Sequence, residues 1–216
     1  MLDHLQVKEQ PRKSLPYLKT TTPYFQDLTD VLLVLTTGEK LPAHAAYLAA
    51  YSSVFSGILE AHSASRSPNA CPASIPLPDC SLQEAETFLC YLYRMRADAQ
   101  LTPKSALAIV KLAHKFDVRV ALEQCDEYLA QQAAINIRTN LLWACGREAL
   151  EWALFAQQYH LNLLEAEAAR YIMNNYLEVE TLEVFEELGQ GLLRRVSRGL
   201  AQELFQCSIA DFGQRC

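Results

Sequence analysis

His44 is the residue whose type and position most invite a chemical role, because it follows a predicted strand and precedes a predicted helix. Acid–base or nucleophilic catalysis would also require a serine or cysteine nucleophile with a fixed partner, and none is recognisable nearby. A lone histidine is more often buried, with its ring nitrogens bonded to backbone groups. We therefore expect His44 to be structural.

Five glutamates near the end of the chain are the other notable group: Glu178, Glu180, Glu183, Glu186 and Glu187. Such a group is ordinarily a solvated helix face, and the alternative is a docking surface for a basic partner segment. Gly189 and Gly191 follow no predicted strand and lack a third glycine, so they form no phosphate-binding loop. No CxxC occurs, and the cysteine spacing matches no recurrent zinc pattern. The sequence predicts no enzyme, no catalytic residue, no metal and no cofactor.

Composition and charge describe a globular, moderately acidic chain. Of the 216 residues, 50% are hydrophobic and 20% are charged, and the formal net charge is -6. This balance excludes disorder of the whole chain. It also disfavours nucleic acid as a partner, because phosphate binding calls for a basic face. No apolar run approaches the ~20 residues of a membrane-spanning helix, so no membrane partner is expected.

The cysteines bear on the cellular compartment. There are seven, an odd number, and the first residues mix Asp3, Lys8 and Glu9 into any apolar stretch, unlike a signal peptide. Reduced thiols are typical of the cytosol and the nucleus. We expect a cytoplasmic and/or nuclear protein.

Three short β signals occur in the first 80 residues. Val31–Leu35 is a continuous apolar run, which predicts a strand buried on both faces. A turn at 36–39 leads to a second predicted strand, Lys40–His44, so the two form a hairpin. A third predicted strand, Ser74–Leu77, ends against Pro78.

Helix signals dominate the remainder. Two short helices are predicted at Ala45–Ala50 and Ser53–Glu60, with Ser52 as a cap. Ser81–Glu84 is a capping box that opens another helix. Thr102-Pro103 starts the next one, and from there almost to the end of the chain only helical periodicity is found.

One internal repeat stands out. Residues 112–118 (LAHKFDV) and 155–161 (FAQQYHL) lie 43 positions apart, and an aromatic–aliphatic pair follows each at the same distance. We interpret each segment as the corner of a helical hairpin, plugged by Phe116 in one copy and Tyr159 in the other. The alternative is a chance similarity between amphipathic helices.

Residues 26–129 resemble a BTB/POZ domain. The segments that carry the resemblance, in chain order, are Asp30-Val31, Leu41–His44, Leu48–Phe55, Ile75–Asp79, Phe88–Tyr93 and Ala113–Val118. Residues 140–205 are similar to the helical BACK-type extension that often follows such a domain. The matching segments there are Ala156–Leu161, Tyr171–Tyr176 and Leu182–Phe185.

The resemblance implies an α+β fold: a BTB/POZ fold, with a small mixed sheet capped by helical hairpins, followed by an all-α BACK-like helical module. The predicted domains are an N-terminal extension at 1–25, a BTB/POZ domain at 26–130 and a BACK-like domain at 139–205.

The resemblance also implies a homodimer. In dimeric BTB domains a basic residue after the motif histidine complements the acidic residue that opens the first strand. Here Asp30 is present, but Ala45 occupies the basic position. Asp30 and Ala45 are therefore the candidate dimer-interface residues, and we expect the homodimer to be weakened.

A cullin is the second partner that the resemblance implies. Cullin-binding BTB domains use the end of the helix matching Ser53–Glu60 and the loop after it, where many carry a hydrophobic–any–Glu triplet. The aligned residues here are Ser63-Ala64-Ser65, while Ile58-Leu59-Glu60 has the right letters but lies inside the predicted helix. The candidate cullin contacts are Ile58, Leu59, Glu60, Ser63 and Ser65, and weak cullin binding is expected.

Two functions follow from the resemblance. The first is an adaptor, similar to the BTB subunits that recruit a protein substrate to cullin–RING ubiquitin ligases. The second is a BTB oligomerisation scaffold or transcriptional co-regulator that binds no cullin. Neither the substrate nor the pathway can be read from the residues.

Overall fold

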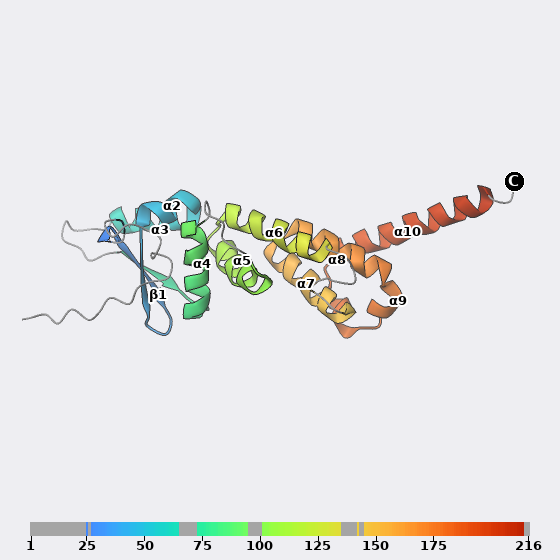
Figure 1. Cartoon of the computed structure of the whole chain (residues 1–216), viewed down its shortest axis with the longest axis horizontal. Helices are drawn as coiled ribbons and strands as arrows, with labels where there is room; N and C mark the ends of the chain where they lie inside the picture. Colours follow the sequence, from blue (N-terminus) through green and yellow to red (C-terminus); the bar gives the residue numbers. More distant parts are fainter. Residues whose placement is uncertain are drawn as a thin grey trace, which may run out of the picture. The chain divides into compact units, whose positions relative to one another are not determined.

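The computed structural model describes residues 25, 27–64, 73–94, 101–134, 142 and 145–213, without the side chains of residues 94 and 203–213. The chain divides into two compact units, one of residues 1–50 and 54–99 and one of residues 51–53 and 100–216. In Figure 1 the first unit carries the labels β1 to α4, and the second carries α5 to α10.

The first unit is built on a three-stranded sheet of order β2-β1-β3. The central strand β1 (Val31–Leu35) pairs antiparallel with β2 (Lys40–Ala43) and parallel with β3 (Ala73–Leu77). The predicted hairpin and the predicted third strand are thus confirmed. A small mixed sheet results, because β3 reaches the free edge of β1 only after a long connection that contains two helices.

The prediction that the first strand is buried on both faces is wrong. Val31, Leu33 and Leu35 are at most 2% exposed, whereas Leu32 and Val34 are only half-buried. Successive side chains of a strand point to opposite faces, so only one face of β1 is fully covered. Leucine and valine are tolerated on a partly covered face. The strand therefore shows no alternation of apolar and polar residues, although only one of its faces is fully buried.

The described residues of the first unit also form the helices α2 (Ala45–Tyr51), α3 (Ser53–Ala64) and α4 (Leu82–Arg94). The helix α3 runs four residues past its predicted end at Glu60. Residues 61–64 contain neither glycine nor proline, so nothing in them stops the helix. Ser63, predicted to lie in a loop, therefore lies in the last turn of α3, and Ser65 lies outside the described residues.

The capping box that opens α4 is present. The Ser81 backbone N–H donates to the Glu84 carboxylate at 2.9 Å, and the Glu84 N–H donates to the Ser81 hydroxyl oxygen at 3.3 Å. Four apolar residues at helical spacing are at most 1% exposed, as predicted: Ala85, Phe88, Leu89 and Leu92. The cap thus fixes where α4 begins, and this apolar stripe fixes which side of it is buried.

The second unit is helical throughout its described residues. Its elements are α5 (Pro103–Lys115), α6 (Arg119–Ala134), α7 (Gly146–Tyr159), α8 (Asn162–Asn174), α9 (Tyr176–Val179), the 3-10 helix η1 (Glu183–Glu187) and α10 (Gln190–Gly213). The helix α8 packs against α6, α7, α9 and α10. Among the described helices, none combines the length and the apolar character needed to cross a membrane.

The repeat is confirmed as one structural unit used twice. The α5–α6 and α7–α8 hairpins turn at equivalent residues, Asp117 (φ 48°) and His160 (φ 57°), both left-handed. In the first corner the Val118 N–H donates to the Ala113 oxygen at 2.8 Å. In the second, 43 residues later, the Leu161 N–H donates to the Ala156 oxygen at 2.9 Å. This six-to-one bond around a left-handed residue is a standard helix C-cap.

The two corner aromatic residues are not equally buried, contrary to the prediction. Phe116 is 4% exposed, whereas Tyr159 is half-buried. The Tyr159 ring packs edge-on against His114 and obliquely against Phe155, and these neighbours are themselves partly exposed. The phenol can keep its hydroxyl in water at such a site, as tyrosine generally requires.

Candidate interaction site

His44, which follows β2, is structural as predicted. It is 6% exposed, and its Nε2 lies 2.6 Å from the Phe25 carbonyl oxygen. Its ring also stacks on the Phe25 ring, with 3.9 Å between the centroids. Its Nδ1 lies 2.7 Å from the Tyr93 hydroxyl oxygen in α4. Both ring nitrogens are thus engaged, and the His44 ring links Phe25, which precedes β1, to Tyr93 of α4. It is therefore not available as a catalytic base.

The hydrogen bonds also define the tautomer of His44. A carbonyl oxygen only accepts, so Nε2 carries the proton that it donates to Phe25. The Tyr93 oxygen accepts the His44 backbone N–H at 3.0 Å, which leaves its own O–H to donate to Nδ1. Burial raises the pKa of Tyr93 above its ordinary value, so this donor stays protonated.

Asp30 lies at the start of β1 and caps α2. The Ala45 backbone N–H, the first of α2, donates to Asp30 Oδ1 at 2.7 Å. A carboxylate is favoured there because the N-terminus of a helix presents unpaired N–H groups and a partial positive charge. Within the chain, the helix itself therefore supplies Asp30 with a donor.

The end of α3 presents the predicted cullin contacts in two different ways. Ile58 and Leu59 are half-buried, whereas Glu60 and Ser63 are exposed. The Ser63 hydroxyl donates to the Glu60 carbonyl oxygen at 2.8 Å, so it turns back onto its own helix. The Glu60 carboxylate accepts from the Ser56 hydroxyl at 2.9 Å, one turn earlier. Leu59 is thus the apolar side chain available beside these polar groups.

A hollow of about 320 Å³ lies between α2 and α3 in the first unit. It brings together five of the residues predicted from sequence: Asp30, Ala45, Leu59, Glu60 and Ser63. Ile58 does not line it. The small side chains of Ala46, Ala49 and Ala73 supply much of the remaining wall. The hollow exists because these three positions are alanines, since longer side chains there would fill it.

The described residues that line the hollow include no recognisable catalytic set. Two carboxylates, Asp30 and Glu60, and the imidazole of His62 line it, but no nucleophile with a positioned base is among its lining residues. Across the residues that the structure describes, no three His, Cys, Asp or Glu side chains are grouped so as to hold a metal ion. An apolar floor with polar groups at the rim suits the docking of another protein segment.

The BTB/POZ domain family model matches residues 22–133, more than half of the chain. The chain belongs to the BTB/POZ domain family. Domains of this family are protein–protein interaction modules, are typically non-enzymatic and generally mediate homo-oligomerisation. The α+β architecture with a small mixed sheet and a helical module agrees with this assignment.

Two similar proteins place the BTB match in context. An Arabidopsis thaliana BTB/POZ domain-containing protein is 23% identical over 140 residues, which cover 63% of this chain and 49% of the relative. The chain thus matches about half the length of this curated relative. Among solved structures, the BTB domain of zebrafish PATZ1 is 21% identical, with a TM-score of 0.38, and the match covers 48% of this chain and 76% of that chain.

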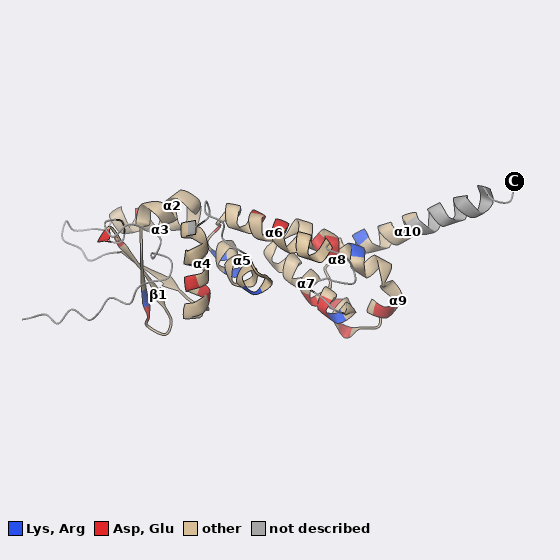
Figure 2. Ribbon diagram, in the orientation of Figure 1, with Lys and Arg blue, Asp and Glu red and all other residues tan. Residues whose placement is uncertain are grey.

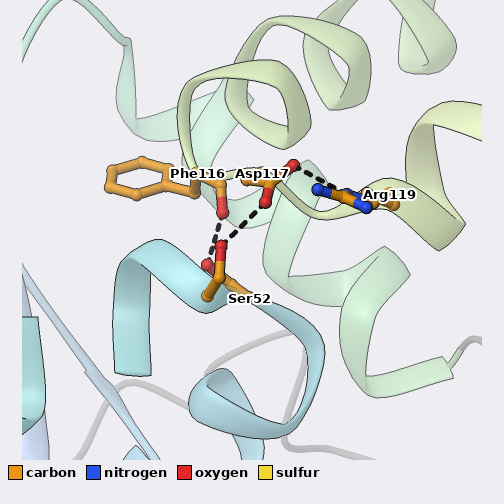
Figure 3. Close-up of polar contacts among 5 residues, drawn as sticks. Ser52, Phe116, Asp117 and Arg119 are labelled. Carbon is orange, nitrogen blue, oxygen red and sulfur yellow. Dashed lines mark hydrogen bonds and ion pairs between the residues drawn. The ribbon is translucent and has the colours of Figure 1, made fainter. Parts of the chain in front are cut away.

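The BTB match extends beyond the first unit into α5 and α6, whose corner carries a polar cluster in the second unit (Figure 3). The Ser52 hydroxyl donates to the Phe116 carbonyl oxygen, and the Ser53 hydroxyl donates to the Asp117 carboxylate at 2.7 Å. The Arg119 Nε donates to the same carboxylate at 3.3 Å. The Ser53 hydroxyl first, and then the Arg119 guanidinium, lower the pKa of Asp117.

Sequence reasoning missed two residues that matter to these sites. Tyr93 bonds His44, and its position at the end of the segment Tyr91-Leu92-Tyr93 was the available signal. Ala46 lines the hollow, and its signal was the run of small residues along α2. Neither sequence pattern indicates a function unless the fold is known, because tyrosine and alanine also occur in ordinary protein cores.

Proposed function

We propose that this BTB protein is an adaptor that brings a protein substrate to a cullin–RING ubiquitin ligase. The hollow between α2 and α3 is the observation that carries the proposal. It places the end of α3, the element that cullin-binding BTB domains use, beside the predicted dimer residues Asp30 and Ala45. This arrangement supports the proposal that one surface carries contacts to both kinds of partner that the family implies.

The proposal assigns Leu59 as the main cullin anchor. Interface energy concentrates in a few apolar or aromatic side chains that become buried on binding. Leu59 is half-buried and lines the hollow, with Glu60 next to it. The neighbouring Ser63 adds no apolar surface, so binding is weak, and this agrees with the absence of the hydrophobic–any–Glu triplet at 63–65.

The helical second unit supplies the remaining parts of the adaptor. Residues 139–205 act as a BACK-like module that extends the cullin contact or positions the substrate, and the substrate remains unassigned. The protein acts in the cytoplasm and/or the nucleus. Its homodimer forms through the Asp30 and Ala45 surface and is weak, because Ala45 provides no cation.

The polar end of α3 also favours a second function. Ser63, whose hydroxyl is already bonded to its own helix, offers a cullin neither an anchor nor a free donor. In this alternative the chain is a BTB oligomerisation scaffold or a transcriptional co-regulator that binds no cullin.

Binding of the purified full chain to a cullin N-terminal region separates the two functions. The adaptor proposal expects measurable micromolar binding by biolayer interferometry. It also expects Leu59→Glu to abolish that binding, because a charge cannot be buried at the anchor point without a large cost. Val54→Glu is the matched control, since Val54 is 38% exposed on the same helix and does not line the hollow.

The outcomes decide directly between the proposals. Loss of binding with Leu59→Glu and retention with Val54→Glu support the adaptor. Absence of binding by the unmodified chain overturns the adaptor and favours the scaffold. Equal effects of the two variants overturn the role of Leu59.

A further inference from the structure

The helix α5 in the second unit is basic, although the chain as a whole is acidic. It carries Lys104, Lys111 and Lys115, all exposed, together with the exposed His114, and it has no carboxylate. The formal net charge of the chain is -6. Figure 2 shows this basic character as blue on α5. Positions 104, 111 and 115 recur at helical spacing, so the lysines share one face.

Aromatic rings from the end of α7 lie beside this basic helix. His114 meets Tyr159 edge-on with 5.4 Å between ring centroids, and it lies 5.7 Å from the His160 ring. Tyr159 in turn packs against Phe155 at 4.7 Å. Both α7 rings are half-buried. We call Lys111, His114, Lys115, Phe155 and Tyr159 the basic–aromatic face.

A complementary element occurs in the same unit. The short helix α9 and the residue after it present Leu177, Glu178 and Glu180, which we call the acidic knob. Leu177 is 81% exposed, the highest value among the exposed large hydrophobic side chains of the described residues, and both glutamates are exposed. Figure 2 shows red on α9. An exposed leucine flanked by carboxylates is the pattern expected of an anchor with a charged rim.

The knob and the face lie at opposite ends of α7. At the start of α7, a Cβ added to Gly146 would meet the Val179 side chain of α9 at 3.0 Å, so α9 packs directly on this end. At the other end, Tyr159 meets His114 of α5. The helix α7, with 14 residues, spans about 21 Å at 1.5 Å per residue. One chain therefore cannot join its own knob to its own face.

We propose that the basic–aromatic face binds the acidic knob of a second copy of this chain. Leu177 of one copy packs against Tyr159 and Phe155 of the next, while Glu178 and Glu180 lie opposite Lys111 and Lys115. The contact joins two different surfaces, so it does not close on itself as a two-fold contact does. Copies therefore add head to tail, independently of any contact made by the first unit.

Nucleic acid is the less suitable occupant of the basic–aromatic face. Its phosphates would meet only the few basic side chains of one helix, whereas nucleic-acid binding calls for a broad basic face. The acidic knob of another copy brings only two carboxylates and supplies the apolar side chain that the half-buried rings can cover.

The test follows the mass of the purified full chain by light scattering and sedimentation over a concentration series, at about 0.05 M and 0.5 M salt. The proposal expects the average mass to rise above that of a dimer at low salt and to fall at high salt. Lys111→Glu/Lys115→Glu and Glu178→Lys/Glu180→Lys should each abolish the rise. Mixing the two variants should restore it, because each then offers the surface that the other needs.

Controls separate this contact from folding and from general charge effects. Arg198→Glu and Glu127→Lys change exposed charges elsewhere in the second unit and should leave the mass curve unchanged. Leu177→Ala removes an exposed side chain without touching the core, so it should keep the melting temperature and lower association several-fold. A mass that never exceeds a dimer, mixed variants that stay apart, or nucleic acid that co-purifies with the chain and depends on Lys111 and Lys115 would each overturn the proposal.

Discussion

The Asp126 carboxylate in α6 accepts the backbone N–H of Leu164 at 2.9 Å, and its second oxygen accepts the N–H of Leu163 at 3.0 Å. Both donors belong to the first turn of α8, whose own N-cap residue, Leu161, has no side chain that can cap. A buried residue of the first hairpin thus caps the second hairpin. This bond fixes the register in which the two copies of the repeat stack.

Replacing the buried Asp126 should strongly destabilise the second unit. Asp126→Ala leaves two N–H groups without their charged acceptor, so we expect a loss of about 2–4 kcal/mol in the free energy of unfolding. Asp126→Asn should cost less, because one oxygen remains as an acceptor. Urea denaturation measures both. Glu127→Ala, an exposed neighbour on α6, should change stability by less than about 0.5 kcal/mol.

The two corner aromatics should differ in their contribution to stability. Phe116→Ala should cost about 3–5 kcal/mol, as expected for a buried core aromatic. Tyr159→Ala should cost about 1–2 kcal/mol, because the ring is only half-buried. The same denaturation experiment compares them. Equal losses at the two corners would show that exposure does not govern their contribution.

The titration of Asp117 should report the polar cluster of Figure 3. Because the hydrogen bonds from Ser53 and Arg119 lower its pKa, the carboxylate stabilises the fold above the ordinary value of about 3.9. That stabilisation is lost as the pH falls through the lowered pKa. Carbon-detected NMR should give a midpoint below 3.9. Ser53→Ala should raise the midpoint, and Ser56→Ala, which removes a bond to Glu60 instead, should not.

A lysine at position 45 should strengthen the homodimer. Ala45 lines the hollow beside Asp30, and the family places a basic residue there that complements the acidic one. Ala45→Lys should therefore lower the dimer dissociation constant by about tenfold, equivalent to about 1.4 kcal/mol. Sedimentation equilibrium measures this constant. Ala50→Lys adds the same charge to α2 away from the hollow, and an equal gain from this control would refute the pairing.

Local sequence signals were sufficient to predict much of the fold. The capping box at Ser81–Glu84 and the turn at 36–39 specify their elements through short-range hydrogen bonds, so the residues involved are adjacent in sequence. The repeat was detectable because two hairpins with the same corner geometry need the same pattern of small, aromatic and aliphatic residues.

Long-range contacts explain what the sequence could not indicate. The caps that Asp126 provides to α8 and Asp30 provides to α2 join residues 38 and 15 positions apart, and an aspartate carries no local sign of such a partner. The length of α3 was underestimated because residues 61–64, although two of them are alanines, lead directly into a segment rich in serine and proline that is typical of a loop. The hollow depends on how α2 and α3 pack, so its lining residues could be proposed individually but not placed together.

The adaptor account is tested most directly by calorimetric titration of a purified cullin N-terminal region into the full chain. It predicts micromolar binding by the unmodified protein. It also predicts that Ser63→Met/Ser65→Glu, which restores the triplet at the end of α3, tightens binding by roughly 30-fold, equivalent to ~2 kcal/mol for one regained anchor. Low-nanomolar binding by the unmodified chain, or an unchanged affinity after the double substitution, would contradict the account.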